Sequence, residues 1–246
     1  MASGLTSGSF AFFVALVPKP LVIAHRGASA EKPENTLAAF ARALELGVDA
    51  IELDVHVTRD GVPVVFHDDS LRRLTGQSGR VAAKTWRELA PLRVQAREPI
   101  PRLSDVLRLT RTREIVQVEI KRGVPVAPVI RAIRTARAAA WVIVASFDPV
   151  VLRRARRVAP AIPRMLISAG RSSPATLVRQ LTACAAKGLS VSHEALRSAA
   201  SVRYFQARGF AVWSWTVNDP ARMRRLARWG IDGILSDNPA LLRRTI

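Results

Sequence analysis

Cysteine is almost absent from this sequence. Cys184 is the single cysteine among 246 residues, so no intramolecular disulfide can form. Nothing therefore indicates an oxidising compartment, and we predict a cytoplasmic location. We interpret the Cys184 thiol as a small buried hydrophobe.

Long hydrophobic runs are also missing. The apolar run from Phe10 to Val17 has no Lys or Arg before it, and it is well short of the roughly 20 residues that span a bilayer. It also lacks the basic start of a signal peptide. We expect a soluble protein with an irregular N-terminal lead-in at residues 1–19, whose apolar run leaves open a weak contact with an anionic membrane surface.

Acidic residues are scarce. The 19 Asp and Glu residues face 38 Lys and Arg residues, which gives a formal net charge of +19. Such an excess attracts polyanions, including nucleic acid, anionic lipid and phosphorylated substrates. The Arg residues lack the interleaved aromatic residues that stack on bases, so a solvated basic surface is the preferred interpretation. A basic nucleic-acid-binding barrel without catalysis is the alternative from a different class of function.

What the sequence does contain is a regular alternation of short β-branched runs and helical patterns. Hydrophobic residues make up 49% of the chain, which is enough for one large core. The alternation is typical of parallel βα units. Strands are predicted at residues 21–24, 50–55, 62–66, 114–121, 141–146, 163–168, 188–192, 211–217 and 232–236.

These nine candidate strands are one more than a closed eight-stranded barrel needs. The connection at Asp60-Gly61 is a hairpin signal, so one strand of that pair is expected to be an antiparallel addition. No G-x-G-x-x-G follows an early strand to support a doubly wound sheet. We predict a single-domain TIM (β/α)8 barrel over residues 20–246. Its clearest helix is expected at residues 35–47, with Asn35 as the starting cap and Gly47 at the end.

Charged side chains gather at the predicted carboxyl ends of the strands, where barrel enzymes carry their active sites. Glu52 and Asp54 are two residues apart on one strand, and Glu119 and Lys121 repeat that spacing on another. Three carboxylates at one barrel mouth would repel each other strongly. A hard divalent cation with oxygen ligands is the natural partner. Pairing of each acid with an Arg is the competing interpretation.

Two histidines end neighbouring strands. His25 and His67 would titrate near neutral pH, so one could accept a proton while the other donates one. The sequence does not say which is the acid. His56 and His193 are interpreted as bystanders. Of Trp213 and Trp215, we expect one to line the mouth and the other to pack outward beneath a helix.

Seven short motifs together resemble one known family. They are HRG at 25–27, PENT at 33–36, ELDV with T-x-D-G through residue 61, HDDSLRRLTG at 67–76, VEIK at 118–121, WTVN at 215–218 and GIDGILSDNP at 230–239. The sequence is similar to the glycerophosphodiester phosphodiesterases over about residues 20–243. Ser236 stands where the family usually has threonine, and the segment between His67 and Glu119 leaves room for only a modest cap.

The resemblance implies a TIM barrel that binds one divalent cation, Mg²⁺ or Ca²⁺, and hydrolyses glycerophosphodiesters to glycerol 3-phosphate and an alcohol. Lysophospholipids cleaved by the same site are the close alternative. The matching positions imply Glu52, Asp54 and Glu119 as metal ligands and His25 and His67 as acid and base. They also imply that Arg26 and Lys121 contact the phosphate and that Trp215 contacts the glycerol or the leaving group. Glu34 and Asn35 are expected to contact these residues rather than the substrate.

Overall fold

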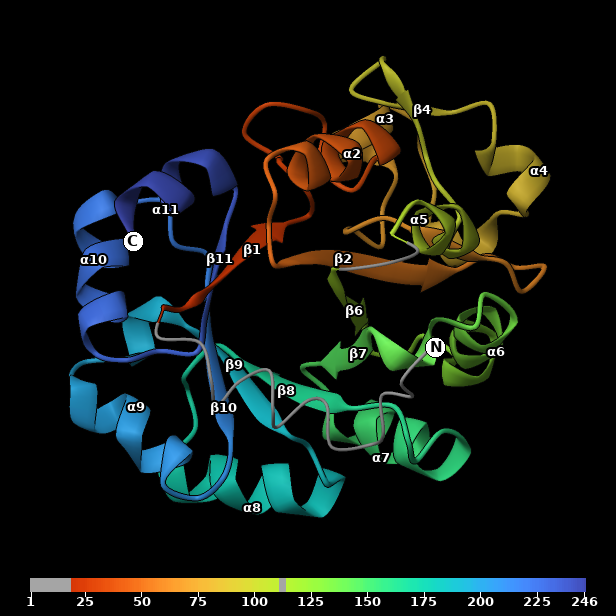
Figure 1. The fold of residues 1–246 in the computed structure, drawn as a ribbon. Coiled ribbons are helices and arrows are strands. Elements are labelled where there is room, and N and C mark those ends of the chain that lie inside the picture. The colour runs from red at the N-terminus through yellow and green to blue at the C-terminus, as the bar shows by residue number, and fades with distance from the viewer. Residues whose placement is uncertain (1–18, 111–113) are drawn as a thin grey trace, which may run out of the picture.

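The fold is a closed parallel barrel surrounded by helices (Figure 1). The computed structural model describes residues 19–110 and 114–246, so the predicted lead-in lies outside the described residues except for Lys19. The barrel closes because β1 pairs with both β2 and β11. Its parallel strands are β1 (Leu21–His25), β2 (Ala50–Val57), β6 (Ile115–Ile120), β7 (Val142–Ser146), β8 (Arg164–Ser168), β9 (Gly188–Ser192), β10 (Ala211–Trp215) and β11 (Gly233–Ser236). The predicted TIM barrel is confirmed.

The ninth predicted strand is the antiparallel addition. Strand β3 (Pro63–Val65) folds back on the end of β2, with Val55 opposite Val65 and Val57 opposite Pro63. Thr58 stabilises the turn, because its Oγ1 accepts the Val62 N–H at 2.9 Å. The hairpin returns the chain to the barrel mouth, and His67 lies two residues beyond the end of β3.

Helices cover the outside of the barrel (Figure 1). Asp and Ser side chains cap α7, α8 and α10, each with Pro in the first turn, which explains why these helices begin where they do. The outer helices are α2 (Leu37–Glu45), α5 (Leu103–Leu109), α6 (Val126–Thr135), α7 (Pro149–Val158), α8 (Pro174–Cys184), α9 (Ala199–Gln206), α10 (Pro220–Arg228) and α11 (Pro239–Thr245), with 3₁₀ turns η2 (Ala138–Ala140) and η3 (His193–Ala195).

The predicted cap of α2 was wrong by one residue. The Thr36 side chain, not that of Asn35, accepts the Ala39 N–H and caps the helix. Asn35 instead has a φ of 58° and is buried. This left-handed conformation, which Asn tolerates better than most residues, directs its amide to the barrel mouth. Gly47 follows the helix with a φ of 68°, as expected for a residue just beyond a helix end.

Two apolar layers hold the barrel together. The larger lies between the strands and the helices and contains the buried Cys184. The smaller fills the barrel interior, where Trp213 packs with Ile23, Met165 and Leu235. The expectation that one of the two tryptophans packs outward was wrong, because residues two apart on a strand share a face and both therefore point into the barrel.

A small cap sits beside the mouth, between β3 and α5. It consists of α3 (Arg72–Thr75), η1 (Val81–Ala83), α4 (Trp86–Leu89), β4 (Arg93–Val94) and β5 (Glu98–Pro99). Phe66, Leu71, Leu89 and Ile100 belong to its own apolar cluster. The cap is modest in size, as predicted. Its two-residue strands were not predicted, since so short a run shows no alternation.

Within the described ranges, no helix has both the length and the apolar character that a membrane crossing requires.

Gly27 provides a test of how the first loop packs on α2. Gly27 and Gly61 both have a φ of 82°. A Cβ on Gly27 would lie 2.7 Å from the Ala39 carbonyl carbon and Cβ, whereas one on Gly61 would meet nothing within 4 Å. Gly27→Ala should therefore lower the free energy of unfolding by about 1–3 kcal/mol more than Gly61→Ala, the usual cost of overpacking. Urea denaturation measures the difference, and equal losses would contradict the close packing.

Candidate active site

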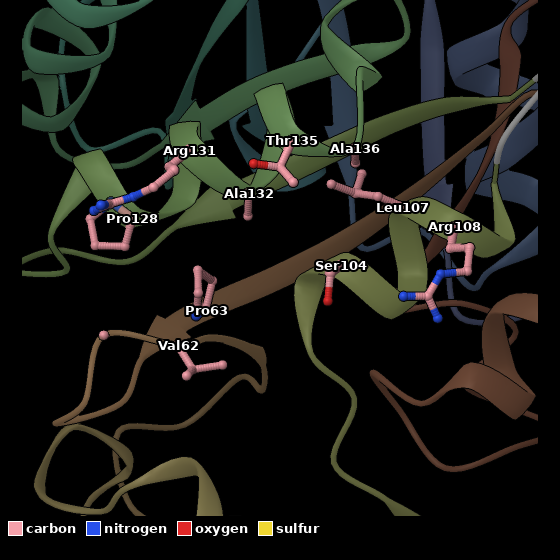
Figure 2. A pocket seen from close by; sticks show the side chains of 11 residues that line it. Val62, Pro63, Ser104, Leu107, Arg108, Pro128, Arg131, Ala132, Thr135 and Ala136 are labelled. Atoms are coloured by element: carbon pink, nitrogen blue, oxygen red, sulfur yellow. The ribbon is translucent and has the colours of Figure 1, made fainter.

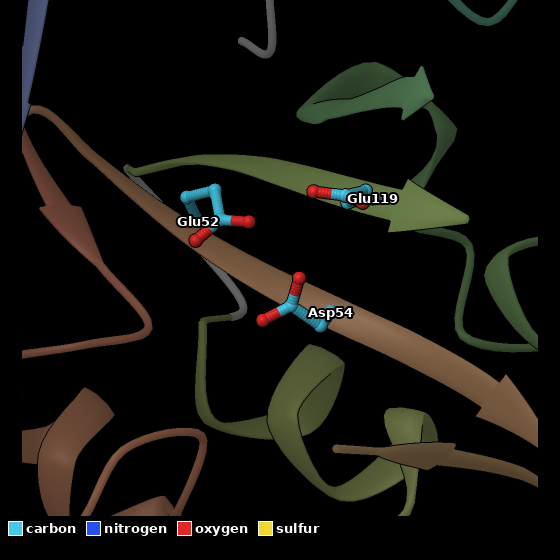
Figure 3. Close-up of side chains that lie close together, drawn as sticks. All are labelled: Glu52, Asp54 and Glu119. Atoms are coloured by element: carbon cyan, nitrogen blue, oxygen red, sulfur yellow. The ribbon is translucent and has the colours of Figure 1, made fainter. Parts of the chain in front are cut away.

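Three buried carboxylates meet inside the mouth of the barrel. Glu52 and Asp54 on β2 and Glu119 on β6 each offer one oxygen, and these atoms lie within 4.8 Å of one another (Figure 3). The parallel register places Asp54 opposite Glu119. Glu52 and Asp54 therefore share one face of β2, as their spacing in the sequence predicted, and they form one cluster with Glu119.

Burial and mutual repulsion make this cluster electrostatically unfavourable by itself. The pKa of Glu52 is raised well above its usual range by burial, and the carboxylates of Asp54 and Glu119 add to the effect. Burial and the charge of Asp54 likewise raise the pKa of Glu119 to about 7. Burial also opposes ionisation of Asp54, but Lys121 and Arg26 hold its pKa well below its usual range.

Lys121 only partly neutralises the three carboxylates. Its Nζ lies 2.5 Å from Asp54 and 2.7 Å from Glu119. Glu52 forms no side-chain ion pair among the described residues and accepts the Arg26 backbone N–H at 3.1 Å. The oxygen donors and their uncompensated negative charge fit a hard metal ion, so Glu52, Asp54 and Glu119 could hold one.

Glu34 and Asn35 contact the residues they were predicted to support. The Asn35 amide donates to Asp54 Oδ2 at 2.8 Å and its carbonyl oxygen accepts the Asp54 backbone N–H at 3.2 Å. Glu34 accepts from Arg26 Nη1 at 2.8 Å. Arg26 Nε lies 3.4 Å from Asp54 but makes no hydrogen bond with the described residues. This donor therefore remains available to a ligand.

Each of the two predicted histidines is held by an aspartate. His25 Nδ1 lies 2.7 Å from Asp237 Oδ1, and His67 Nδ1 lies 2.6 Å from Asp68 Oδ1. A carboxylate can only accept, so Nδ1 carries the proton when the imidazole is neutral and Nε2 is left for the pocket. Burial lowers the pKa of His67, although the charge of Asp54 partly offsets this.

Asp68, Asp237 and Arg73 were missed as site residues. Arg73 donates to Asp68 at 2.6 and 2.9 Å and to Glu34 at 2.9 Å through two nitrogens. Arg73 therefore connects Asp68, which contacts His67, with Glu34, which contacts Arg26. Both aspartates stand beside quoted motif residues, in HDD and SDNP, and that adjacency was the available signal.

Asp237 is itself well supported. Its carboxylate accepts from His25, from Ser29 Oγ at 3.1 Å and from Asn218 Nδ2 at 2.6 Å. Burial favours the neutral acid, but these donors outweigh it and lower the pKa of Asp237 to about 2. Asp237 is therefore a carboxylate at neutral pH, and its contact with Nδ1 orients the His25 ring.

The other two histidines differ in their surroundings. His56 is buried, and its Nε2 donates to the His67 carbonyl oxygen at 3.1 Å. It therefore contacts the backbone of a site residue rather than the carboxylate cluster. His193 follows β9 in η3 and does not line the pocket.

The cluster opens into a small pocket of about 90 Å³. Phe147 and Trp215 form its rim, with their rings edge to face at 5.6 Å. Its walls contain His25, Arg26, Glu52, His67, Gln117, Glu119, Lys121, Phe147, Ile167, Ser190, Trp215 and Leu235. All three groups of predicted ligand, proton-transfer and phosphate residues therefore contribute to one cavity.

A second groove, of about 470 Å³, lies between the β2–β3 hairpin, α5 and α6 (Figure 2). Val62, Leu107 and Ala132 give it a mainly apolar wall, and its lining includes neither a carboxylate nor a histidine. This larger groove offers no proton-transfer group, so the chemistry of the side chains assigns the candidate active site to the smaller pocket.

A closed parallel barrel with carboxylates, histidines and basic side chains at the carboxyl ends of its strands defines the class, which is that of TIM-barrel enzymes. A sequence model of the glycerophosphoryl diester phosphodiesterase family matches residues 25–241, and the chain belongs to that family. The resemblance found in the motifs is thereby confirmed.

Known relatives agree with this assignment. A glycerophosphodiester phosphodiesterase of Caldanaerobacter subterraneus subsp. tengcongensis is 35% identical over 240 residues, covering 91% of this chain and 96% of the relative. A probable glycerophosphodiester phosphodiesterase 2 of Mycobacterium tuberculosis is 33% identical, covering 91% of this chain and 89% of the relative. An Oleispira antarctica phosphodiesterase, solved in complex with the product sn-glycerol-3-phosphate, superimposes with a TM-score of 0.86 at 27% identity, covering 97% of this chain and 98% of that one.

Proposed function

We propose that this enzyme hydrolyses glycerophosphodiesters to sn-glycerol 3-phosphate and an alcohol with the help of one divalent cation, Mg²⁺ or Ca²⁺. The observation that carries the proposal is the meeting of three carboxylates and two aspartate-held histidines in one pocket. The product bound to the Oleispira antarctica relative supports the same substrate class.

A phosphodiester resists hydrolysis because its negative charge repels nucleophiles and its leaving alkoxide is poor. Glu52, Asp54 and Glu119 would hold the cation, which supplies positive charge to the phosphate oxygens when bound. The half-buried Arg26 and Lys121 are in position to add to that charge, since both line the pocket. These residues would stabilise the charge that develops during attack.

The histidines would move the protons. With Nδ1 of each ring held by an aspartate, Nε2 of one imidazole would accept a proton from the attacking water or substrate hydroxyl. Nε2 of the other would protonate the departing alcohol. Attack by a neighbouring substrate hydroxyl would give a cyclic phosphate on the way, and the assignment of acid and base stays open between His25 and His67.

A coupled assay for released glycerol 3-phosphate tests the function directly. Glycerophosphocholine, glycerophosphoethanolamine and glycerophosphoinositol should each be tried, because the aromatic rim residues Phe147 and Trp215 carry no charge that would select one head group. The proposal fails if none of these diesters yields glycerol 3-phosphate in the presence of Mg²⁺ or Ca²⁺.

Chelation should abolish the activity. Adding EDTA is expected to stop hydrolysis and excess Mg²⁺ or Ca²⁺ to restore it, because carboxylate oxygens are hard donors and the cluster has no thiolate or clustered imidazoles to favour zinc. Comparing the two ions at equal concentration would identify the preferred one. Full activity after exhaustive chelation would contradict the cation-dependent mechanism.

Lysophospholipids are a second candidate substrate class, favoured by one observation. Phe147 is 45% exposed beside Trp215, so the rim offers an apolar surface to a longer substrate. Rates on lysophosphatidylcholine and glycerophosphocholine should be compared below and above the micellar concentration. A higher kcat/KM on the lipid would move the proposed activity to that class.

A further inference from the structure

Two polar side chains deep in the pocket lack hydrogen-bond partners. Gln117 Oε1 and Ser190 Oγ are buried and bond to none of the described residues. Gln117 is 1% exposed and Ser190 is fully buried at 0%. A buried polar atom left unpaired is costly, so such atoms in a cavity wall indicate a ligand or water that completes them.

Both side chains belong to the wall of the catalytic pocket. Gln117 precedes Glu119 by two residues on β6 and lies opposite Glu52 in the strand register. It therefore shares the inward face of Glu119 but lies deeper in the barrel. Ser190 comes from β9, which β7 and β8 separate from β6 in the strand order. The two unpaired atoms thus approach the cavity from different sides.

The pocket changes in character from its floor to its rim. At depth, Gln117 and Ser190 share the pocket wall with the buried apolar residues Ile167 and Leu235, so this part of the wall carries no charge. At the rim, Phe147 and Trp215 present aromatic surface. Glu52 lies opposite Gln117 in the strand register, and Asp54 and Glu119 follow two residues further along their strands toward the rim. A phosphate would lie against this carboxylate cluster.

We propose that Gln117 and Ser190 form a hydroxyl-binding subsite that takes the glycerol moiety of the substrate, with the leaving alcohol directed toward the aromatic rim. This inference rests on the proposed function. An amide oxygen accepts from a hydroxyl, and a serine hydroxyl donates or accepts, so the pair suits a neutral polyol. The pocket of about 90 Å³ is small and its floor is lined by buried side chains, which suits a short polyol better than a lipid chain.

The subsite is tested with substrates that differ by one hydroxyl. Glycerophosphocholine is compared with its two analogues in which propane-1,2-diol or propane-1,3-diol replaces glycerol. Wild-type enzyme is expected to prefer the glycerol diester over at least one analogue by about 10–100-fold in kcat/KM, because the missing hydroxyl leaves a buried atom unpaired. A wild-type enzyme that hydrolyses all three equally well overturns the proposal.

Gln117→Met and Ser190→Ala should each remove that preference. Both should lower kcat/KM for the glycerol diester by about 10-fold or more, while kcat/KM for the analogue that wild-type enzyme disfavours stays within about twofold. That analogue lacks the hydroxyl that the removed side chain would bind, so it loses no contact. Equal slowing of all substrates would mean that Gln117 and Ser190 serve the structure alone, and the subsite would be withdrawn.

Ser214→Ala is the matched control. Ser214 is also a fully buried serine, but its Oγ donates to the Val191 carbonyl oxygen at 3.0 Å and it does not line the pocket. Its replacement should lower the melting temperature and leave the preference for glycerol unchanged. If Ser214→Ala also lost the preference for the glycerol diester, the preference would depend on the overall stability of the barrel and not on a subsite.

Binding measurements separate the subsite from the proposed reaction. Calorimetry with sn-glycerol 3-phosphate and ethyl phosphate should show tighter binding of the first to wild-type protein, and the difference should disappear in Ser190→Ala. If no diester is hydrolysed but this difference holds, the proposed function fails and the hydroxyl subsite stands. Equal binding of both phosphates to wild-type protein overturns the subsite whatever the enzyme hydrolyses.

Discussion

Glu52→Gln and Asp54→Asn are each expected to lower kcat/KM by at least about 100-fold while shifting the stability of the metal-free protein in opposite directions. Even partners that only orient metal ligands cost about 10–100-fold when removed, so a lost ligand should cost more. Glu52 forms no side-chain ion pair among the described residues, and its burial raises its pKa. Neutralising it removes repulsion, so Glu52→Gln should melt at a higher temperature than wild type in EDTA.

Asp54→Asn should melt lower in the same buffer. Its carboxylate faces Lys121 at 2.5 Å and Arg26 at 3.4 Å, so its neutralisation takes one carboxylate partner from each of these half-buried cations. Breaking a buried pair in this way typically costs about 3–5 kcal/mol. Melting curves in EDTA, with turnover measured at limiting and saturating cation, check both variants. Near-normal turnover at limiting cation would remove that residue from the predicted ligand set.

The pH dependence of metal-free stability has a definite sign. Glu119 has a pKa of about 7 in the folded protein against its ordinary value of 4.5, so the folded state binds more protons than the unfolded state between these values. Stability should therefore fall as pH rises through that window. Glu52 acts in the same direction, and Glu52→Gln should flatten the slope. A wild-type slope of the opposite sign would contradict the carboxylate repulsion.

Loss of either His25 or His67 is the other change with a large expected effect. Each alanine variant should lose about 100-fold or more in kcat/KM, the usual scale for a positioned proton-transfer group. The losses should be far from additive in the double variant, because a site without one proton-transfer partner gains little from the other. The kcat/KM of the wild-type enzyme should follow a bell-shaped pH profile.

An activated leaving group would assign the two roles. A glycerophosphodiester of p-nitrophenol needs no protonation of its leaving group, so it should largely rescue the variant that lost the acid and leave the variant that lost the base slow. His193→Ala is the control, since this ring does not line the pocket, and it should behave as wild type on both substrates. Equal rescue of both site variants, or of neither, would mean that the histidines do not divide the work in this way.

The order of the elements could be predicted from the sequence because each depends on neighbours along the chain. Alternating β-branched runs and helical patterns gave the eight barrel strands, and Asp60-Gly61 identified the hairpin that adds the ninth. The same local logic located the charged residues at strand ends. Spacing of two along a strand then predicted that Glu52 and Asp54 share a face, and their meeting with Glu119 follows from barrel closure.

The pairing of His25 was decided by tertiary structure, whereas His67 pairs with its neighbour in the sequence, Asp68. His25 and Asp237 are 212 positions apart, and they meet only because β1 and β11 are neighbours in the closed barrel. Asn35 has a plausible role as a helix cap in sequence, but its left-handed backbone directs it to Asp54 instead. Short sequence patterns predict neither the His25–Asp237 contact nor the Asn35–Asp54 contact, because each joins residues that are distant along the chain.

The sequence by itself therefore determined the barrel, its family and most of the candidate site residues, since periodicity and short motifs are local properties of the chain. The tertiary structure decided that Asp237 holds His25, that Arg73 links two of the site's acids, and that Trp213 fills the barrel interior. It also decided which buried polar atoms remain unpaired in the wall of the pocket. These features arise when strands close into a ring, which brings residues from opposite ends of the chain into contact at distances that no local pattern encodes.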